Sequence, residues 1–187
     1  MTVTLLGLSG SLRAGSHNTA ILRAIGDALG QEAVLTMHGL GDVPLYNGDL
    51  DTDPALPAVA ALRAAIGAAD GLIIASPEYN YGVPGVLKNA LDWASRPYGR
   101  APLAAKPVLT LTSSMATTGG ARAQAQLNET LMAIGARIVL RGQTVIASAH
   151  EHMKGDAFVN DGTIGFAMDG VRQLIADIAR WRRFDTD

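Results

Sequence analysis

The residues from Ser9 to Asn18 have the composition of a phosphate-binding loop. They supply three hydroxyl groups, two glycines, one arginine and one asparagine, and a helical pattern follows them. Backbone and hydroxyl donors, close approach at glycine, a fixed cation and a helix N-terminus together favour a bound phosphate. The same composition also suits a Ser/Gly-rich connector that only caps the helix.

Two well-known nucleotide-binding motifs are absent from this loop. Gly10 and Gly15 have the spacing of a Walker loop, but Ser16-His17 stand where that motif requires Lys and Ser/Thr. A Rossmann motif needs GxGxxG and an acidic residue closing the second strand, whereas the chain runs into Met37-His38 there. The loop therefore favours a single phosphate ester over a nucleotide with several phosphates.

A second segment, Ser76 to Gly85, has the residue types that bind a flat heterocycle. It contains two tyrosines and an asparagine among turn-forming prolines and glycines, and Pro84 suits the first turn of the following helix. A planar amphipathic ligand needs an aromatic wall, amide donors and acceptors at its rim, and backbone that comes close. This segment supplies all three.

These loops fall between elements that predict a doubly wound α/β sheet. Apolar runs without polar alternation are typical of parallel strands covered on both faces, and they occur at Val3–Leu8, Ala33–Met37, Gly71–Ala75, Pro107–Leu111 and Ile138–Ile146 (broken at Arg141-Gly142). Helical stripes alternate with them, and the clearest is Val171, Leu174, Ile175, Ile178 and Trp181. The pattern predicts a five-stranded parallel sheet with helices on both faces, in one domain over residues 1–187. Ligands of such sheets bind at the carboxyl ends of the strands.

Composition excludes several classes of function. Of the 187 residues 48% are apolar and 17% are charged, and the formal net charge of -2 lacks the basic excess of a nucleic-acid binder. There is no cysteine, so thiolate metal sites and cysteine nucleophiles are excluded. The apolar stretch from Leu56 to Ala75 is interrupted by Pro57, Arg63 and Asp70, which argues against a membrane span. The first residues lead directly into a strand without a signal peptide, so we expect a cytoplasmic protein.

The two motifs together resemble a known family. Ser76 to Trp93 is similar to the signature of the NADPH-dependent FMN reductase family, which includes chromate, quinone and azo-dye reductases. Gly10-Ser11-Leu12-Arg13, with Ser16 and Asn18, resembles the phosphate loop of that family. The resemblance runs from the first strand to at least Gln124. It implies a flavodoxin-like fold, non-covalently bound FMN, and assembly as a homodimer or homotetramer.

The resemblance also implies a set of cofactor-binding residues. The phosphate would be held by Ser9, Ser11, Arg13, Ser16 and Asn18. The isoalloxazine would be lined by Pro77, Glu78, Tyr79, Asn80, Tyr81 and Gly82. A third loop, Thr112 to Arg122, resembles the family's loop beside the pyrimidine end of the ring, through Ser113, Ser114 and Gly119. Its Met115-Ala116-Thr117 departs from the smaller residues common in the family.

The resemblance implies an oxidoreductase in which flavin N5 carries the chemistry and no side chain is catalytic. NADPH or NADH would pass a hydride to FMN, and a small-molecule acceptor would then be reduced in a ping-pong cycle. For Glu78, a carboxylate that braces the loop or a partner subunit is favoured over a general acid. Two alternatives are an FMN-binding electron-transfer protein without NAD(P)H turnover and a phosphate-binding regulatory module without flavin.

The segment His150-Glu151-His152 raises the question of a metal site. Alternate residues on an extended segment share a side, which would bring the two imidazoles together. No third ligand follows at a recognisable spacing. A solvated loop is therefore the favoured interpretation, and no metal is expected.

Overall fold

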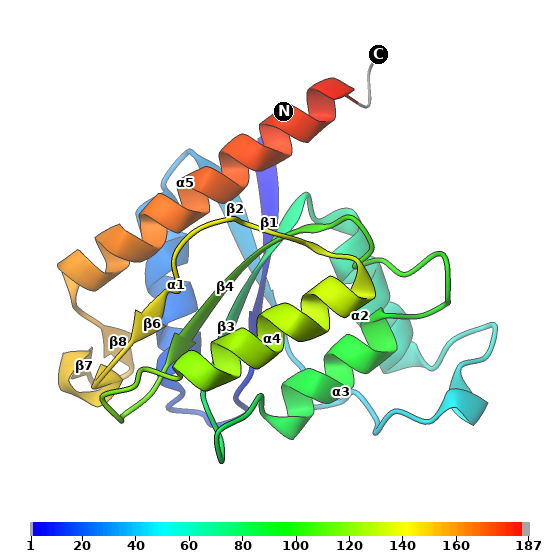
Figure 1. Cartoon of the computed structure of the whole chain (residues 1–187), viewed down its shortest axis with the longest axis horizontal. Coiled ribbons are helices and arrows are strands. Elements are labelled where there is room, and N and C mark those ends of the chain that lie inside the picture. Colours follow the sequence, from blue (N-terminus) through cyan, green and yellow to red (C-terminus); the bar gives the residue numbers. More distant parts are fainter. Residues whose placement is uncertain (1, 185–187) are drawn as a thin grey trace.

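Strands and helices alternate along the chain in the computed structural model, which describes residues 2–184 (Figure 1). The strands are β1 (Val3–Ser9), β2 (Ala33–His38), β3 (Gly71–Ser76), β4 (Pro107–Ser113), β5 (Arg137–Ile138), β6 (Val145–Ile146), β7 (Met153–Lys154) and β8 (Ala157–Phe158). The helices are α1 (His17–Leu29), α2 (Pro57–Ala68), α3 (Gly85–Ala94), α4 (Ala121–Ile134) and α5 (Asp161–Phe184), with short 3-10 helices η1 (Gly48–Leu50) and η2 (Ala149–His152).

The sheet is parallel, with the strand order β2-β1-β3-β4-β5. This is the flavodoxin-like order, and it confirms the predicted fold class. Successive strands are added toward one edge from β1 to β2 and toward the other edge from β3 onward, so the strand order switches between β1 and β3, which are direct neighbours. Their register pairs Ser9 with Ala75, and the next pair of strands aligns Ser76 with Thr112. The carboxyl ends of β1, β3 and β4 therefore meet at one edge.

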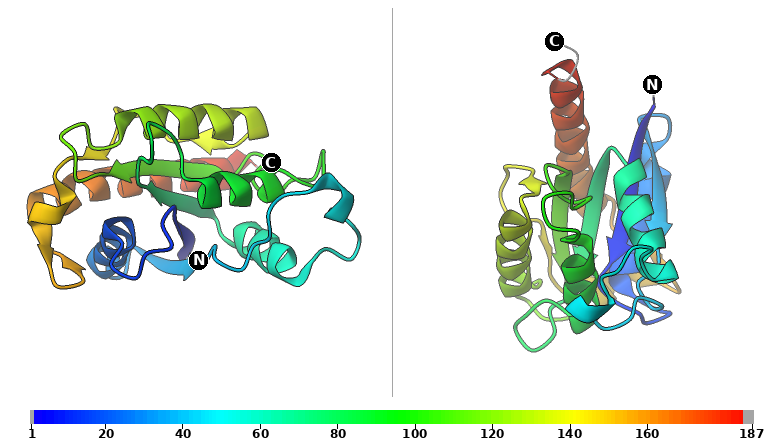
Figure 2. Two further views of the ribbon diagram at one scale, coloured as in Figure 1. Left: turned by 90° about the horizontal axis from the view of Figure 1, so that it is seen from below. Right: turned by 90° about the vertical axis from the view of Figure 1, so that its right-hand side faces the viewer.

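Helices cover both faces of the sheet (Figures 1 and 2). Ile73 and Ala75 of β3 pack with α1 and α5, whereas Leu72 and Ile74 pack with α2, α3 and α4. This division follows from the two-residue period of a strand, which sends successive side chains to opposite faces. Because β3 and β4 are buried along their whole length, their apolar runs show no polar alternation.

Two strand predictions need correction. The predicted fifth strand is two short strands, β5 and β6, which both pair with β4 and are separated by residues 139–144. The predicted second strand was expected to be covered on both faces, but Val34 and Met37 of β2 are exposed. In the described part of the chain β2 lies at the edge of the sheet and pairs with β1 alone. An edge strand is covered less completely by helices than the central strands are, so part of its surface stays exposed.

The last helix is longer than the sheet that it covers. Val171, Leu174 and Ile178 of α5 are buried against the core, as the stripe predicts, while Trp181 is about half exposed. Figure 2 shows the carboxyl end of α5 running past the end of the strands. Within residues 2–184, no helix has both the length and the apolar character needed to cross a bilayer.

The central strand predicts a clear difference between two similar substitutions. Ile73→Ala removes a fully buried side chain from β3 and leaves a cavity, which should lower the free energy of unfolding by about 2–5 kcal/mol. Val34→Ala, on the exposed edge strand, should change it by about 0.5 kcal/mol or less. Urea unfolding of the two variants measures both values, and equal losses would contradict the assigned positions of β2 and β3.

Candidate functional site

The loop between β1 and α1 is shaped by its own hydroxyl groups. Ser16 caps α1, because its Oγ accepts a hydrogen bond from the Thr19 amide at 3.2 Å. Ser11 Oγ accepts a bond from the Arg13 amide at 3.3 Å and also contacts the hydroxyl of Tyr79 at 3.3 Å. Ser9 lies behind this layer, where its Oγ accepts from Thr19 Oγ1 at 2.9 Å. The sequence therefore folds locally around the N-terminus of α1.

Gly10 allows this loop to lie against the end of β3. Its amide donates to the carbonyl of Ala75 at 2.8 Å. A Cβ atom at Gly10 would lie 3.0 Å from Ser76 Oγ and 3.2 Å from Pro77 Cδ, which is tighter than almost all such contacts. The crowding of these side chains around the Gly10 backbone explains why glycine stands here.

The tyrosine-bearing loop after β3 ends in a tight turn. The Tyr79 amide donates to the Gly82 carbonyl at 3.1 Å, and the Gly82 amide donates back to the Tyr79 carbonyl at 3.0 Å. Asn80 and Tyr81 both have positive φ values, 50° and 68°, as the two central residues of a type I′ turn do. The two tyrosines occupy different surroundings, since the Tyr79 hydroxyl contacts Ser11 and the Tyr81 ring packs against Arg122.

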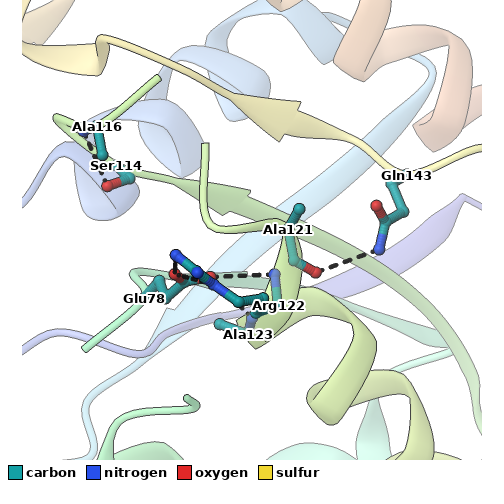
Figure 3. Close-up of polar contacts among 7 residues, drawn as sticks. All are labelled: Glu78, Ser114, Ala116, Ala121, Arg122, Ala123 and Gln143. Atoms are coloured by element: carbon teal, nitrogen blue, oxygen red, sulfur yellow. Dashed lines mark hydrogen bonds and ion pairs between the residues drawn. The ribbon is translucent and has the colours of Figure 1, made fainter. Parts of the chain in front are cut away.

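Glu78 joins this loop to the N-terminus of α4 (Figure 3). Its carboxylate accepts hydrogen bonds from the amides of Arg122 and Ala123, both at 3.0 Å, and forms an ion pair with the Arg122 guanidinium at 2.7 Å. The side chain of Glu78 is only 6% exposed. Burial opposes its ionisation, but the bonds from Arg122 and Ala123 and the charge of Arg122 hold the pKa of the carboxyl below its usual value.

The bracing role expected for the Glu78 carboxylate is thus what the structure shows, within one chain. Arg122 extends the brace, since its guanidinium carbon lies 3.7 Å from the centre of the Tyr81 ring. Gln126 adds a third contact, because its Oε1 accepts from the Val83 amide at 2.7 Å. An ionised carboxylate with these partners has no proton to donate.

The third loop is held by β6 and by the segment that follows it. The Ser114 amide donates to the Ile146 carbonyl at 3.1 Å, and the Ala149 amide donates to the Ser114 carbonyl at 3.0 Å. Ser114 Oγ also accepts from the Ala116 amide at 3.1 Å (Figure 3). Gly119, with a φ of 61°, packs against β6, where a Cβ atom would lie 3.0 Å from that of Val145. The loop is thereby fixed at both ends.

The three loops meet around a pocket of 190 Å³ at the carboxyl ends of β1, β3 and β4. The residues lining it are Ser11, Arg13, Ser16, His17, Asn18, Pro77, Glu78, Tyr79, Ser113, Ser114 and Met115. Two of these, Asn18 and Ser113, are 3% and 2% exposed, and Asn18 Oδ1 and Ser113 Oγ have no hydrogen-bond partner. Buried polar atoms without partners are costly, so these two atoms are candidates for contact with a bound ligand.

Most of the predicted site residues line this pocket, but five do not. Ser9 supports the loop from behind, and Asn80, Tyr81 and Gly82 form the outer turn, where Tyr81 is 72% exposed. Gly119 faces β6. Sequence reasoning missed His17 and Met115, although each stands inside a motif that it had identified.

Other features of the molecule lie apart from this site. Hollows of 510 Å³ and 680 Å³ lie between β5 and α5 and between α3 and α4, away from the edge where parallel sheets bind ligands. His152 is engaged by Asn160 Nδ2 at 3.1 Å and packs against the Phe158 ring. Over residues 2–184, no group of three or more His, Cys, Asp or Glu side chains is placed to hold a metal ion.

Known proteins resemble this chain over most of its length. Residues 3–151 match the model of the NADPH-dependent FMN reductase family. An NAD(P)H-dependent FMN reductase of Pseudomonas aeruginosa is 36% identical over 181 residues, which are 97% of this chain and 96% of that protein. A quinone reductase of Escherichia coli is 46% identical over 139 residues, covering 73% of this chain and 72% of the other.

A solved structure agrees with these sequence matches. FerB of Paracoccus denitrificans, described as a flavoenzyme NAD(P)H:(acceptor) oxidoreductase, superposes with a TM-score of 0.85. The two chains are 28% identical, and the match covers 96% of this chain and 98% of FerB.

Removal of the Glu78 charge should destabilise the protein in a pH-dependent way. Glu78→Gln breaks the ion pair with Arg122 and weakens the bonds to α4, so the free energy of unfolding at about pH 7 should fall by about 1–3 kcal/mol. The pKa of Glu78 is lower in the folded protein than its usual value of 4.5. The carboxylate therefore contributes its full stability above pH 4.5, and this stability is lost as the pH falls through the lowered pKa of the folded protein. The difference between wild type and variant should therefore shrink in acid.

Urea unfolding across the acidic range measures this difference. Glu129→Gln, on the exposed part of the same helix, is the matched control and should have little effect at any pH. A loss for Glu78→Gln that is constant with pH would contradict the ion pair as its cause.

Proposed function

The chain belongs to the NADPH-dependent FMN reductase family, and we propose that the pocket where its three loops meet is the FMN site. The family uses FMN with NAD(P)H as the electron donor, so this chain is an NAD(P)H-dependent oxidoreductase. One observation supports this location of the FMN site. The loops after three adjacent strands meet at one pocket, and two residues that line it, Asn18 and Ser113, each have a buried polar atom without a hydrogen-bond partner.

The residues of the pocket fit the chemistry of FMN. A monophosphate needs hydroxyl and amide donors and a cation, which Ser11, Ser16 and Arg13 supply beside the N-terminus of α1. In the part of the chain that the structure describes, no carboxylate lies within ion-pair distance of Arg13, so its charge remains available for an anion. The unpartnered Asn18 Oδ1 and Ser113 Oγ suit the hydroxyl and ring polar groups of the rest of the ligand.

Pro77, Tyr79 and Met115 give the pocket an apolar side suited to a flat ring. Tyr79 is about half exposed and Met115 more so, which places apolar surface at the open rim. Bound FMN supplies hydride transfer, the chemistry that no side chain of the pocket provides. The chain binds and orients the reactants, and backbone amides at the N-terminus of α1 favour negative charge.

No side chain of the site is proposed to be catalytic. Glu78 is the acidic group nearest to that role, yet its carboxylate is ionised and bonded to Arg122 and Ala123. We propose instead that NAD(P)H and the acceptor use the same open side of the pocket in turn, which gives ping-pong kinetics. The exposure of Tyr79 and Met115 on the pocket wall supports this order, because it leaves an accessible side for both reactants.

The acceptor is proposed to be a small oxidised molecule such as a quinone. Quinone reductases are among the relatives, and the apolar rim suits such a ring. We further propose that residues 1–187 form one FMN-binding domain, that the protein is cytoplasmic, and that it forms a homodimer or homotetramer. The exposed Tyr98, beside the hollow between α3 and α4, supports a contact between copies there.

A steady-state assay tests the enzymatic function. Purified protein loaded with FMN should oxidise NADPH or NADH in the presence of a quinone, with the parallel double-reciprocal lines of a ping-pong cycle. FMN-loaded protein that transfers electrons but does not oxidise either nicotinamide would support the electron-transfer alternative. Protein that binds no added FMN would exclude the proposed site.

Arg13 should contribute strongly to FMN affinity. Arg13→Ala removes a charge-assisted contact to the phosphate worth about 1.5–3 kcal/mol, so the dissociation constant should rise about tenfold or more. Quenching of FMN fluorescence on binding measures this change. Arg23→Ala, on an exposed part of α1, is the control and should leave the affinity unchanged. An unaltered FMN affinity in Arg13→Ala would refute the position of the phosphate.

A further inference from the structure

His17 lies on the wall of the proposed FMN site. It is the first residue of α1, directly after the capping residue Ser16, and its half-buried side chain lines the pocket with Arg13 and Asn18. The pocket holds unpartnered buried polar atoms of Asn18 and Ser113, so a ligand is indicated there independently of His17. An imidazole in this position has the chemistry to donate a hydrogen bond to a phosphate oxygen.

A second histidine reaches the same region from a distant part of the chain. The Ala149 amide donates to the Ser114 carbonyl at 3.0 Å, and the Ser148 amide donates to the Ala116 carbonyl at 3.4 Å. These bonds hold η2 against the third loop. His150 is the second residue of η2, and a positive charge on it would lower the pKa of His17. His150 is thus a neighbour of the site, and its companion His152 is not, because Asn160 engages it elsewhere.

The surroundings of His17 oppose its protonation when no ligand is present. Burial is the largest cause, and the positive charges of Arg13 and His150 add to it, so the pKa of the imidazole lies below its usual value. The other titratable groups on the pocket wall are Glu78, which is ion-paired with Arg122, and Tyr79. The carboxylate on this wall is therefore already committed to a different cation.

We propose that His17 is a further phosphate-binding residue of this chain, which takes up a proton from solvent as the FMN phosphate enters and then binds it as an imidazolium. This inference rests on the proposed function, because it needs FMN in the same pocket. The dianion reverses the unfavourable electrostatics, since a phosphate beside Arg13 and His17 favours the charged imidazole.

The coupling has a definite sign. Between the pKa of His17 in the free protein and its higher pKa in the complex, FMN binding takes up a proton. The contribution of His17 to FMN affinity is therefore largest below the lower of these values and is lost as the pH rises through the higher one. Each unit by which the phosphate raises the pKa gives about tenfold in affinity.

The decisive experiment compares FMN and riboflavin binding to wild type and His17→Asn. The variant should bind FMN about tenfold more weakly at about pH 6, with a smaller difference at about pH 8.5. Because the same ligand is used for both proteins, titration of the FMN phosphate itself cancels from the ratio. Riboflavin lacks the phosphate, so its affinity should be the same for both proteins. His38→Asn, outside the pocket, is the matched control and should behave as wild type.

A proton NMR titration of the wild type provides a readout that needs no variant. The chain has four histidines, so their ring signals can be assigned by substitution. The pKa of His17 should rise when FMN is added and should not change with riboflavin. FMN binding with no shift of His17, or an equal loss of FMN and riboflavin affinity in His17→Asn, would overturn this inference alone. Failure of the wild type to bind FMN would overturn the proposed function as well.

Discussion

The carboxylate of Glu78 is the contact on which the geometry of the site depends. It belongs to the loop after β3, yet its partners are the first residues of α4, 44 and 45 positions later in the chain. These contacts join the tyrosine loop to α4, the helix that follows the third loop, and so connect two walls of the pocket. Burying a single carboxylate is costly, and two backbone amides and an arginine offset that cost.

The contact between Glu78 and Arg122 also explains why Tyr79 and Tyr81 have different surroundings. Tyr79 precedes the turn and contacts Ser11, which brings it to the pocket, whereas Tyr81 follows Asn80 in the turn and lies beneath the Arg122 guanidinium. Positive φ values at two residues other than glycine are unfavourable in isolation. Contacts from Arg122 and Gln126 hold the turn in this conformation. The outer tyrosine thus supports the wall that the inner one forms.

Much of this arrangement could be predicted from the sequence because it depends on local signals. Ser16 as a helix cap and the buried runs of β3 and β4 follow from residue type and period, and they place the loops at one edge. Pairing between distant segments has no such signal. The partner of Glu78, the exposed side of β2 and the position of His150 all depend on tertiary contacts. The interruption of the predicted fifth strand depends on which of its residues form hydrogen bonds with β4.

The residues that support the pocket are different from the residues that form its rim. Glu78 and Gln126 hold the wall from the side of α4, while Met115 of the rim is exposed and takes no part in that anchorage. Substitutions at the rim therefore leave the scaffold intact. A change at such a position can alter which molecules fit the opening without rebuilding the cradle beneath.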